Sequence, residues 1–170
     1  MRHVAYLSIG TNLGDRIKNI EICINGISEK SKITQMSSVY ETEPWGYEDD
    51  NKYLNVVVKI TTDFHALKLL QSLKFIEKNM GRKQSTSSTM YSSRIIDIDI
   101  LFFNLDIINE KKLIVPHPQL YFRNYVLEPF SEINDNFICP VTHKSIAYYN
   151  QKSIDLCQVS VYKDQIMFKT

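Results

Sequence analysis

Two acidic residues, Asp97 and Asp99, lie within the stretch SRIIDIDILFF (residues 93–103), which otherwise has the composition of a buried strand. In a β-strand, residues two positions apart point to the same face, and their side chains lie roughly 6.5–7 Å apart. The two carboxylates should therefore share one face of a strand. The opposite face carries the isoleucines that would pack in the core, which are Ile96, Ile98 and Ile100.

Two carboxylates this close repel each other and raise each other's pKa unless a positive charge lies between them. Mg²⁺ prefers oxygen ligands and typically takes one or two protein carboxylates together with phosphate oxygens. The pair therefore predicts a magnesium site. The alternative is the solvent-facing side of a half-exposed strand, and a D-x-D pattern by itself favours that alternative because short motifs have many false positives.

Basic residues near the acidic pair favour a phosphate-bearing ligand. Arg94 lies three residues before Asp97 and is expected at the junction of the strand with a loop, from which it can turn toward the carboxylates. Arg82 and Lys83 open that loop, whose Ser- and Thr-rich composition is typical of a mobile segment. Guanidinium groups bind phosphate oxygens in a forked geometry, so metal and arginine could share one ligand.

Two further basic side chains come later in the chain. His117 lies between two prolines in VPHPQL, and Arg123 lies in FRNY. His117 could donate to a phosphate or act as a base, and the alternative is a structural turn histidine. For Arg123 the alternative is an ion pair at a helix end.

Aromatic and amide side chains gather near EPWGY and YLN. Tyr53 and Asn55 are two apart on a predicted strand and so share a face, with Trp45 and Tyr47 in the preceding loop. An aromatic ring beside an amide could stack on a flat heterocycle and hydrogen-bond to its edge. Ordinary sheet packing is the alternative for Tyr53. No Walker P-loop, G-x-G-x-x-G, H-E-x-x-H or G-x-S-x-G motif occurs in the sequence.

The composition bounds the class of protein. The chain has 170 residues, of which 44% are hydrophobic and 23% charged, which suits one globular domain spanning 1–170. A formal net charge of +1 gives no global field for nucleic acid. Three widely separated cysteines support neither a zinc site nor a disulfide framework. With no signal-peptide pattern and no stretch long enough to span a membrane, a cytoplasmic location is expected.

Hydrophobic periodicity predicts four main strands and two helices in the order strand, helix, strand, strand, helix, strand. Asp15 and Asp63 are placed at the helix starts, and Gly81 should end the second helix. This order is the βαββαβ, or ferredoxin-like, pattern of an α+β fold with an antiparallel sheet. Residues 115–133 read as irregular with short helical pieces, and 156–170 as a late hairpin. The strands are predicted at 4–10, 32–40, 53–62 and 93–103, and the helices at 15–30 and 63–81.

Six stretches, taken together, make the chain resemble the 6-hydroxymethyl-7,8-dihydropterin pyrophosphokinase family. They occur in family order between about residues 4 and 140, and residues 145–170 match no family feature. The combination of R-x-x-D-x-D-I-L with a following V-P-H-P is especially specific. The stretches are YLSIGTNLGDR, SSVYETEPWGY, YLNVVVKI, LKFIEKNMGR, SRIIDIDILFF and VPHPQLYFRNYVLEPFSEI.

The resemblance implies a three-layer αβα version of the ferredoxin-like fold. It implies that the chain transfers diphosphate from ATP to 6-hydroxymethyl-7,8-dihydropterin in folate biosynthesis and releases AMP. The chain would act as a monomer on small molecules, with no nucleic-acid or membrane partner.

The resemblance also implies a role for each matched residue. Two Mg²⁺ ions would be held by Asp97 and Asp99, while Arg82 and Arg94 would bind phosphates during transfer. The pterin would lie between Tyr53 and Tyr125, its edge bound by Asn55 and by the backbone around Thr42, Pro44, Trp45 and Gly46. ATP would contact Glu77, Ile100, Lys112, His117 and Arg123.

Some positions depart from the family pattern. The loop before Arg94 reads Y-S-S-R where the family often has W-G-P-R, and Lys112 stands where arginine is common. A non-catalytic ferredoxin-like module for RNA or a regulatory ligand is the alternative function, but an acidic pair and a near-neutral charge disfavour RNA. A D-x-D nucleotide-sugar transferase is a third reading, for which the chain is short.

Overall fold

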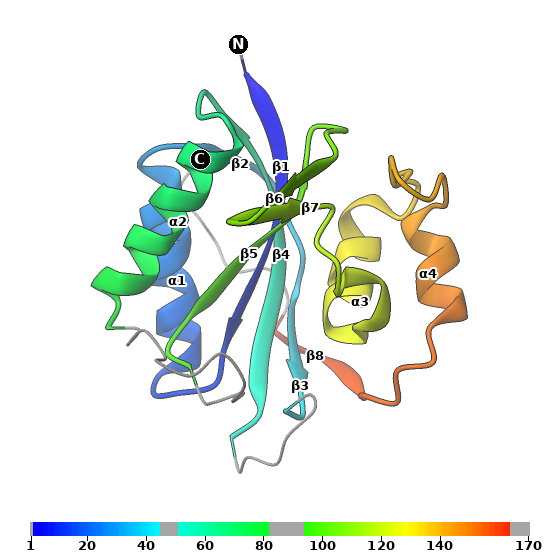
Figure 1. Cartoon of the computed structure of the whole chain (residues 1–170). Helices are drawn as coiled ribbons and strands as arrows, with labels where there is room; N and C mark the ends of the chain where they lie inside the picture. The colour runs from blue at the N-terminus through cyan, green and yellow to red at the C-terminus, as the bar shows by residue number, and fades with distance from the viewer. Residues whose placement is uncertain (1, 45–50, 82–93, 164–170) are drawn as a thin grey trace.

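A central antiparallel sheet carries most of the residues singled out above. The computed structural model of the chain describes residues 2–44, 51–81 and 94–163. Within these ranges the sheet has six strands in the order β5–β1–β4–β3–β8, with β2 also paired to β4 (Figure 1). The sheet strands are β1 (His3–Thr11), β2 (Lys32–Met36), β3 (Val39–Thr42), β4 (Tyr53–Thr62), β5 (Asp97–Phe103) and β8 (Val159–Lys163).

Helices cover both faces of this sheet, which gives the predicted three-layer αβα arrangement (Figure 1). The order β1–α1–β2/β3–β4–α2–β5 is the ferredoxin-like pattern, confirmed with two additions. One is a small hairpin after β5, and the other is a C-terminal extension whose last described strand is β8. The remaining elements are α1 (Arg16–Ser28), α2 (Ala66–Asn79), β6 (Ile108–Glu110), β7 (Leu113–Val115), the 3₁₀ turn η1 (Leu120–Phe122), α3 (Asn124–Asn134) and α4 (Ile146–Lys152).

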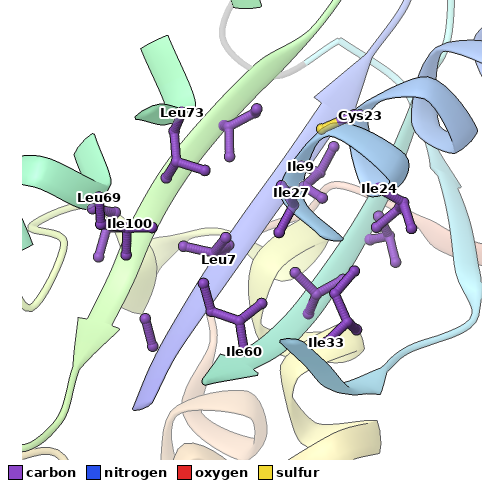
Figure 2. Close-up of a cluster of buried hydrophobic side chains, with 14 of the residues drawn as sticks. Leu7, Ile9, Cys23, Ile24, Ile27, Ile33, Ile60, Leu69, Leu73 and Ile100 are labelled. Atoms are coloured by element: carbon purple, nitrogen blue, oxygen red, sulfur yellow. The ribbon is translucent and has the colours of Figure 1, made fainter. Parts of the chain in front are cut away.

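The first face of the sheet packs against α1 and α2 through aliphatic side chains (Figure 2). Ile24 and Ile27 of α1 and Leu69 and Leu73 of α2 are at most 2% exposed, so each helix turns an aliphatic stripe toward the sheet. The strands contribute every second residue to this layer. These are Leu7 and Ile9 of β1, Val56, Val58 and Ile60 of β4, and Ile98 and Ile100 of β5.

The second face is divided into an apolar end and a polar end. At the apolar end α3 and α4 pack on Tyr6, Val57 and Leu101, and the Tyr6 and Phe130 rings stack with centroids 4.6 Å apart. Further along the same strands and on the same face, the side chains become polar. Because alternation along a strand is fixed, these polar groups must face the side on which α3 lies. They are Ser8 of β1, Tyr53 and Asn55 of β4, and Asp97 and Asp99 of β5.

The structure corrects several local predictions. The single strand expected at 32–40 is two strands, because the Ser37 side chain accepts from Val57 N at 3.0 Å and the Ser38 amide donates to Glu132 of α3. Asp63 does not cap α2, whose N-cap is His65 without a side-chain hydrogen bond. Asp15 caps α1 through Lys18 N at 3.1 Å.

The C-terminal predictions were partly wrong. Residues 115–133 contain most of the eleven-residue helix α3 rather than short helical pieces, and α4 was not foreseen. Of the hairpin expected at 156–170, the described part contains one strand, β8, which pairs antiparallel with β3, and residues 164–170 lie outside the described residues. Gly81 does follow the end of α2, with a φ of +89° that suits glycine. None of the helices in the described ranges has the length and apolar content that crossing a membrane requires.

The stacked Tyr6–Phe130 pair should be a main source of stability for the second layer. Phe130 is fully buried, so Phe130→Ala should lower the free energy of unfolding by about 3–5 kcal/mol through lost burial and a residual cavity. Phe75→Ala is the matched control, because Phe75 is 64% exposed on α2 and should change stability by less than about 0.5 kcal/mol. Urea titration followed by circular dichroism measures both, and equal losses would contradict this division of the core.

Candidate active site

A cavity of about 340 Å³ opens at the polar end of the second face. Strands β1, β4 and β5 form its floor, while α2, the end of β3 and the segment from His117 to Tyr125 form its walls. Nine residues predicted from the sequence line it, so the structure brings together groups up to 83 positions apart. They are Thr42, Tyr53, Asn55, Arg94, Asp97, Asp99, His117, Arg123 and Tyr125.

The acidic pair lies on the cavity floor, on the edge strand β5. Asp97 and Asp99 share the face predicted for them, while Ile98 between them is fully buried in the opposite layer. Desolvation by burial and the nearby negative charge of Asp97 raise the pKa of the Asp99 carboxyl. The charges of His117, Lys74 and Arg123 act in the opposite direction and lower it. The cavity floor is therefore a place where positive charge would be stabilised.

His117 is held in one orientation beside Asp99. Its backbone amide donates to Leu101 O at 3.0 Å, and its Nδ1 accepts from Gln119 N at 3.2 Å. The neutral ring therefore carries its proton on Nε2, which lies 4.0 Å from Asp99 Oδ2. Burial lowers the pKa of His117, with the Asp99 charge opposing that shift. A neutral ring held this way is a hydrogen-bond donor to the cavity.

Arg94 lies at the loop–strand junction, as predicted, and its guanidinium pairs with Asp97. Asn12 fixes its backbone, since Asn12 Oδ1 accepts from Arg94 N at 2.6 Å and Asn12 N donates to Arg94 O at 3.1 Å. The arginine is thus anchored by its main chain. Its side chain shares the surface of the cavity with the acidic pair.

On β4, the Asn55 side chain is hydrogen-bonded to Thr42, and it lies beside Gly10, which has no side chain to cover it. Asn55 Nδ2 donates to Thr42 Oγ1 at 2.9 Å, and both residues are at most 3% exposed. Gly10 faces Asn55 across the β1–β4 ladder, and a Cβ atom there would lie 3.1 Å from Asn55 Oδ1. Tyr53 lies two residues before Asn55 on the same face. The predicted grouping of an aromatic ring and an amide is present.

Arg123 and Tyr125, at the beginning of α3, form the cavity wall that this helix contributes. The Arg123 guanidinium carbon lies 5.6 Å from the centroid of the Tyr125 ring. The cavity therefore has an aromatic side chain on β4 and another on α3, together with the acidic pair on its floor and His117 in its wall.

Lys74 lines the cavity and was not found from the sequence. It lies one helical turn before Glu77 on α2, and its Nζ contacts Glu77 at 3.0 Å. Glu77 is 3% exposed and also accepts from Ile98 N at 2.8 Å, which ties α2 to the strand between the two aspartates. The i,i+3 spacing of a Lys and a Glu was the available signal. Also missed were Ser8, Gly10, Pro118 and Gln119.

Not every predicted residue lies in the cavity. The Ile100 side chain belongs to the core on the opposite face, so only its backbone could meet a ligand. Lys112 is exposed in the β6–β7 turn, and neither it nor Pro44 lines the cavity. Arg82, Trp45 and Gly46 lie outside the described residues.

The side chains that line the cavity limit which metal ions and ligands it could hold. Within the described ranges, no group of three or more His, Cys, Asp or Glu side chains is arranged to hold a metal ion by itself. Two carboxylates on one strand suit a hard cation that completes its coordination with ligand phosphates and water. Positive side chains from α2, the β5 junction and α3 would meet an anionic ligand beside it.

Comparison with known proteins identifies the family. Residues 6–135 match the model of 7,8-dihydro-6-hydroxymethylpterin-pyrophosphokinase. The chain belongs to this family. It is 38% identical over 135 residues to the 2-amino-4-hydroxy-6-hydroxymethyldihydropteridine pyrophosphokinase of Bacillus subtilis, which covers 78% of this chain and 79% of that protein. The Aquifex aeolicus enzyme of the same name is 37% identical, covering 87% and 91%.

Longer proteins contain a region similar to this chain. The chain is 40% identical to the folic acid synthesis protein fol1 of Pneumocystis carinii and spans 20% of that protein's length. Plasmodium falciparum HPPK-DHPS, solved with pteroate, superposes with a TM-score of 0.74 over 89% of this chain and 44% of that one, at 19% identity. This likeness confirms the fold. Membership of the pyrophosphokinase family leaves the non-catalytic module without support.

The charge repulsion around Asp99 should lower stability when no cation is bound. Because its pKa is raised in the folded protein, the Asp99 carboxylate destabilises the native state above that pKa, and this effect disappears as pH falls through it. In chelator-treated buffer at pH 7, Asp99→Asn should therefore raise the melting temperature by about 2 °C, a modest value because the side chain is 38% exposed and screened. The gain should shrink toward pH 4.

Asp106→Asn is the control, because Asp106 is exposed in the turn after β5. Scanning calorimetry at both pH values measures the difference. A melting temperature of Asp99→Asn below that of the unsubstituted protein at pH 7 would contradict the repulsion.

Proposed function

We propose that this chain transfers the terminal diphosphate of ATP to the hydroxymethyl group of 6-hydroxymethyl-7,8-dihydropterin, in folate synthesis. The hydroxyl oxygen forms a bond to the β-phosphorus, and the bond from that phosphorus to the oxygen bridging to the α-phosphorus breaks. AMP leaves with that electron pair, and the hydroxyl proton is released. The observation that carries the proposal is the acidic pair on the floor of a cavity with aromatic walls, in a chain of this family.

Magnesium fits the donor set of this cavity. The two carboxylates of Asp97 and Asp99 would hold it, in keeping with a cation that takes few protein oxygens and completes its shell from phosphates. When bound, it would neutralise phosphate charge and orient the reacting oxygens. We propose two ions, as the family resemblance implies.

The protein's own side chains would bind and orient the two substrates. Tyr53 and Tyr125 would lie on the two faces of the pterin, and Asn55 would hydrogen-bond to its edge. His117, with its proton on Nε2, and Arg123 would donate to ATP phosphates. Arg94 would move from Asp97 toward the transferred phosphates as charge develops there. Transfer of this kind depends on positioning and charge rather than on a covalent intermediate.

The product distinguishes this reaction from ordinary phosphoryl transfer. Purified protein with ATP, MgCl₂ and 6-hydroxymethyl-7,8-dihydropterin should form AMP and the pterin diphosphate in equal amounts, and no ADP. Anion-exchange chromatography separates these products. Formation of ADP, or no dependence on the pterin, would refute the proposal.

The acidic pair should be indispensable for turnover. Asp97→Ala and Asp99→Ala should each reduce kcat/KM at least ~10²-fold, because each removes a ligand that holds charge in the transition state. Arg94→Ala should cost less than either. Asp106→Ala, beyond the carboxyl end of the same strand, is the matched control and should retain full activity. Near-normal rates in both cavity variants would refute the metal assignment.

A further inference from the structure

The C-terminal segment (residues 153–163) lies beyond the region that matches the family model and contacts two walls of the cavity. In Figure 1 the chain leaves α4, which packs against α3, and runs to β8 at the edge of the sheet. On the way, Asp155 meets the beginning of α3. β8 then pairs with β3, where Thr42 lies opposite Val159. The segment therefore joins the element that carries Arg123 and Tyr125 to the element that carries Thr42.

The beginning of α3 has no cap of its own. Its N-cap residue is Arg123, whose side chain makes no capping hydrogen bond and lines the cavity instead. The first amides of a helix need acceptors, and arginine does not supply one at this position. Because Arg123 lines the cavity and does not cap the helix, the first amides of α3 need a hydrogen-bond acceptor from another part of the chain.

Asp155 supplies that acceptor from 31 positions away. Its Oδ2 accepts from Asn124 N at 2.8 Å, and its backbone oxygen accepts from Asn124 Nδ2, also at 2.8 Å. Asn124 lies between Arg123 and Tyr125 in the chain. A carboxylate at this end of the helix is also favoured by the helix dipole. The Asp155 contact thus fixes the backbone on which both cavity side chains are mounted.

Hydrogen bonding rather than apolar burial holds the segment at this point. Ile154 and Leu156, on either side of Asp155, are 88% and 94% exposed. Asp155 Oδ1 accepts from Cys157 N at 3.0 Å, and Asp155 N donates to Ser153 Oγ at 3.2 Å. Hydrogen bonds to and from Asp155 therefore set the local conformation of residues 153–157.

We infer that Asp155 is a positioning residue for substrate binding, which acts through the beginning of α3 to hold Arg123 and Tyr125 against the cavity. This inference rests on the proposed function for the identity of the ligands. Its structural part, that Asp155 orders the first turn of α3, stands independently of the reaction.

The test compares the full-length protein with Asp155→Ala, Asp155→Asn and the control Asp15→Ala. Asp15 caps α1, so its loss removes a carboxylate cap of the same kind from the opposite layer. Hydrogen exchange at amides 124–127 should accelerate in Asp155→Ala but not in Asp15→Ala. Asp155→Asn, which retains an oxygen acceptor, should restore most of the protection.

Binding gives the second measurement. Dissociation constants for 6-hydroxymethyl-7,8-dihydropterin and for α,β-methylene-ATP with Mg²⁺ should rise about five- to tenfold in Asp155→Ala, the size of effect that a lost cap produces. The kcat at saturating substrate should fall by less than ~3-fold, because the loss is in binding. Asp15→Ala should bind both ligands like the unsubstituted protein even if it melts at a lower temperature.

The outcomes separate the two proposals. Unchanged exchange at 124–127, or binding of both ligands by Asp155→Ala at the unsubstituted affinity, would overturn the inference. Absence of AMP formation by the unsubstituted protein would overturn the proposed function alone, and the exchange measurement would still decide the role of Asp155.

Discussion

Alternation along the first part of β5, from Asp97 to Leu101, is the constraint on which the rest of this structure depends. Ile98 and Ile100 bury one face of the strand in the first core, where α2 packs on β5. Asp97 and Asp99 cannot turn away from each other without exposing those isoleucines, because a shift of one residue would exchange the two faces. The apolar side of the strand thus holds the carboxylates together. The free energy of hydrophobic burial opposes their electrostatic repulsion, and a cavity that attracts cations is the result.

The same reasoning applies to the neighbouring strands. β1 and β4 each send aliphatic side chains to the first core, and on their second face they change from apolar to polar residues along their length. Helix α3 covers the apolar part, and its first turn reaches the boundary, where Arg123 and Tyr125 lie. One face of one sheet therefore provides both an anchor for a helical layer and the floor of the cavity. Rigid strands suit this role because the cavity groups need fixed separations.

How much could be predicted from the sequence depended on whether a signal was local. Period-two and period-3.6 patterns identified the strands and the two helices that face the first core, because each buries a continuous stripe. Helix α3 was underestimated because it contains Pro129 and its N-cap is an arginine, so the usual start signal is absent. The interruption between β2 and β3 depends on Glu132, 94 positions from Ser38, and no local pattern reveals it.

The candidate site shows the same distinction. Carboxylates, an asparagine and a tyrosine on strands were predicted to share a face, and they do, because alternation is a local rule. Lys74 was missed because its approach to the cavity depends on how α2 lies across β5, which the Glu77–Ile98 hydrogen bond fixes. Ile100 was matched to the site by family resemblance, yet its side chain follows the alternation rule and enters the core.

Helix α3 illustrates how a residue that lines the cavity affects the structure outside it. A strong cap at position 123 would stabilise the helix locally, but a serine or aspartate there could not extend a guanidinium into the cavity. The chain instead places arginine at the cap and obtains an acceptor from Asp155, in a segment beyond the matched family region. A helix cap and a guanidinium in the cavity place different demands on position 123, and the Asp155 carboxylate supplies the acceptor that Arg123 does not. This arrangement requires the C-terminal segment to be held in place, and the pairing of β8 with β3 anchors it to the sheet.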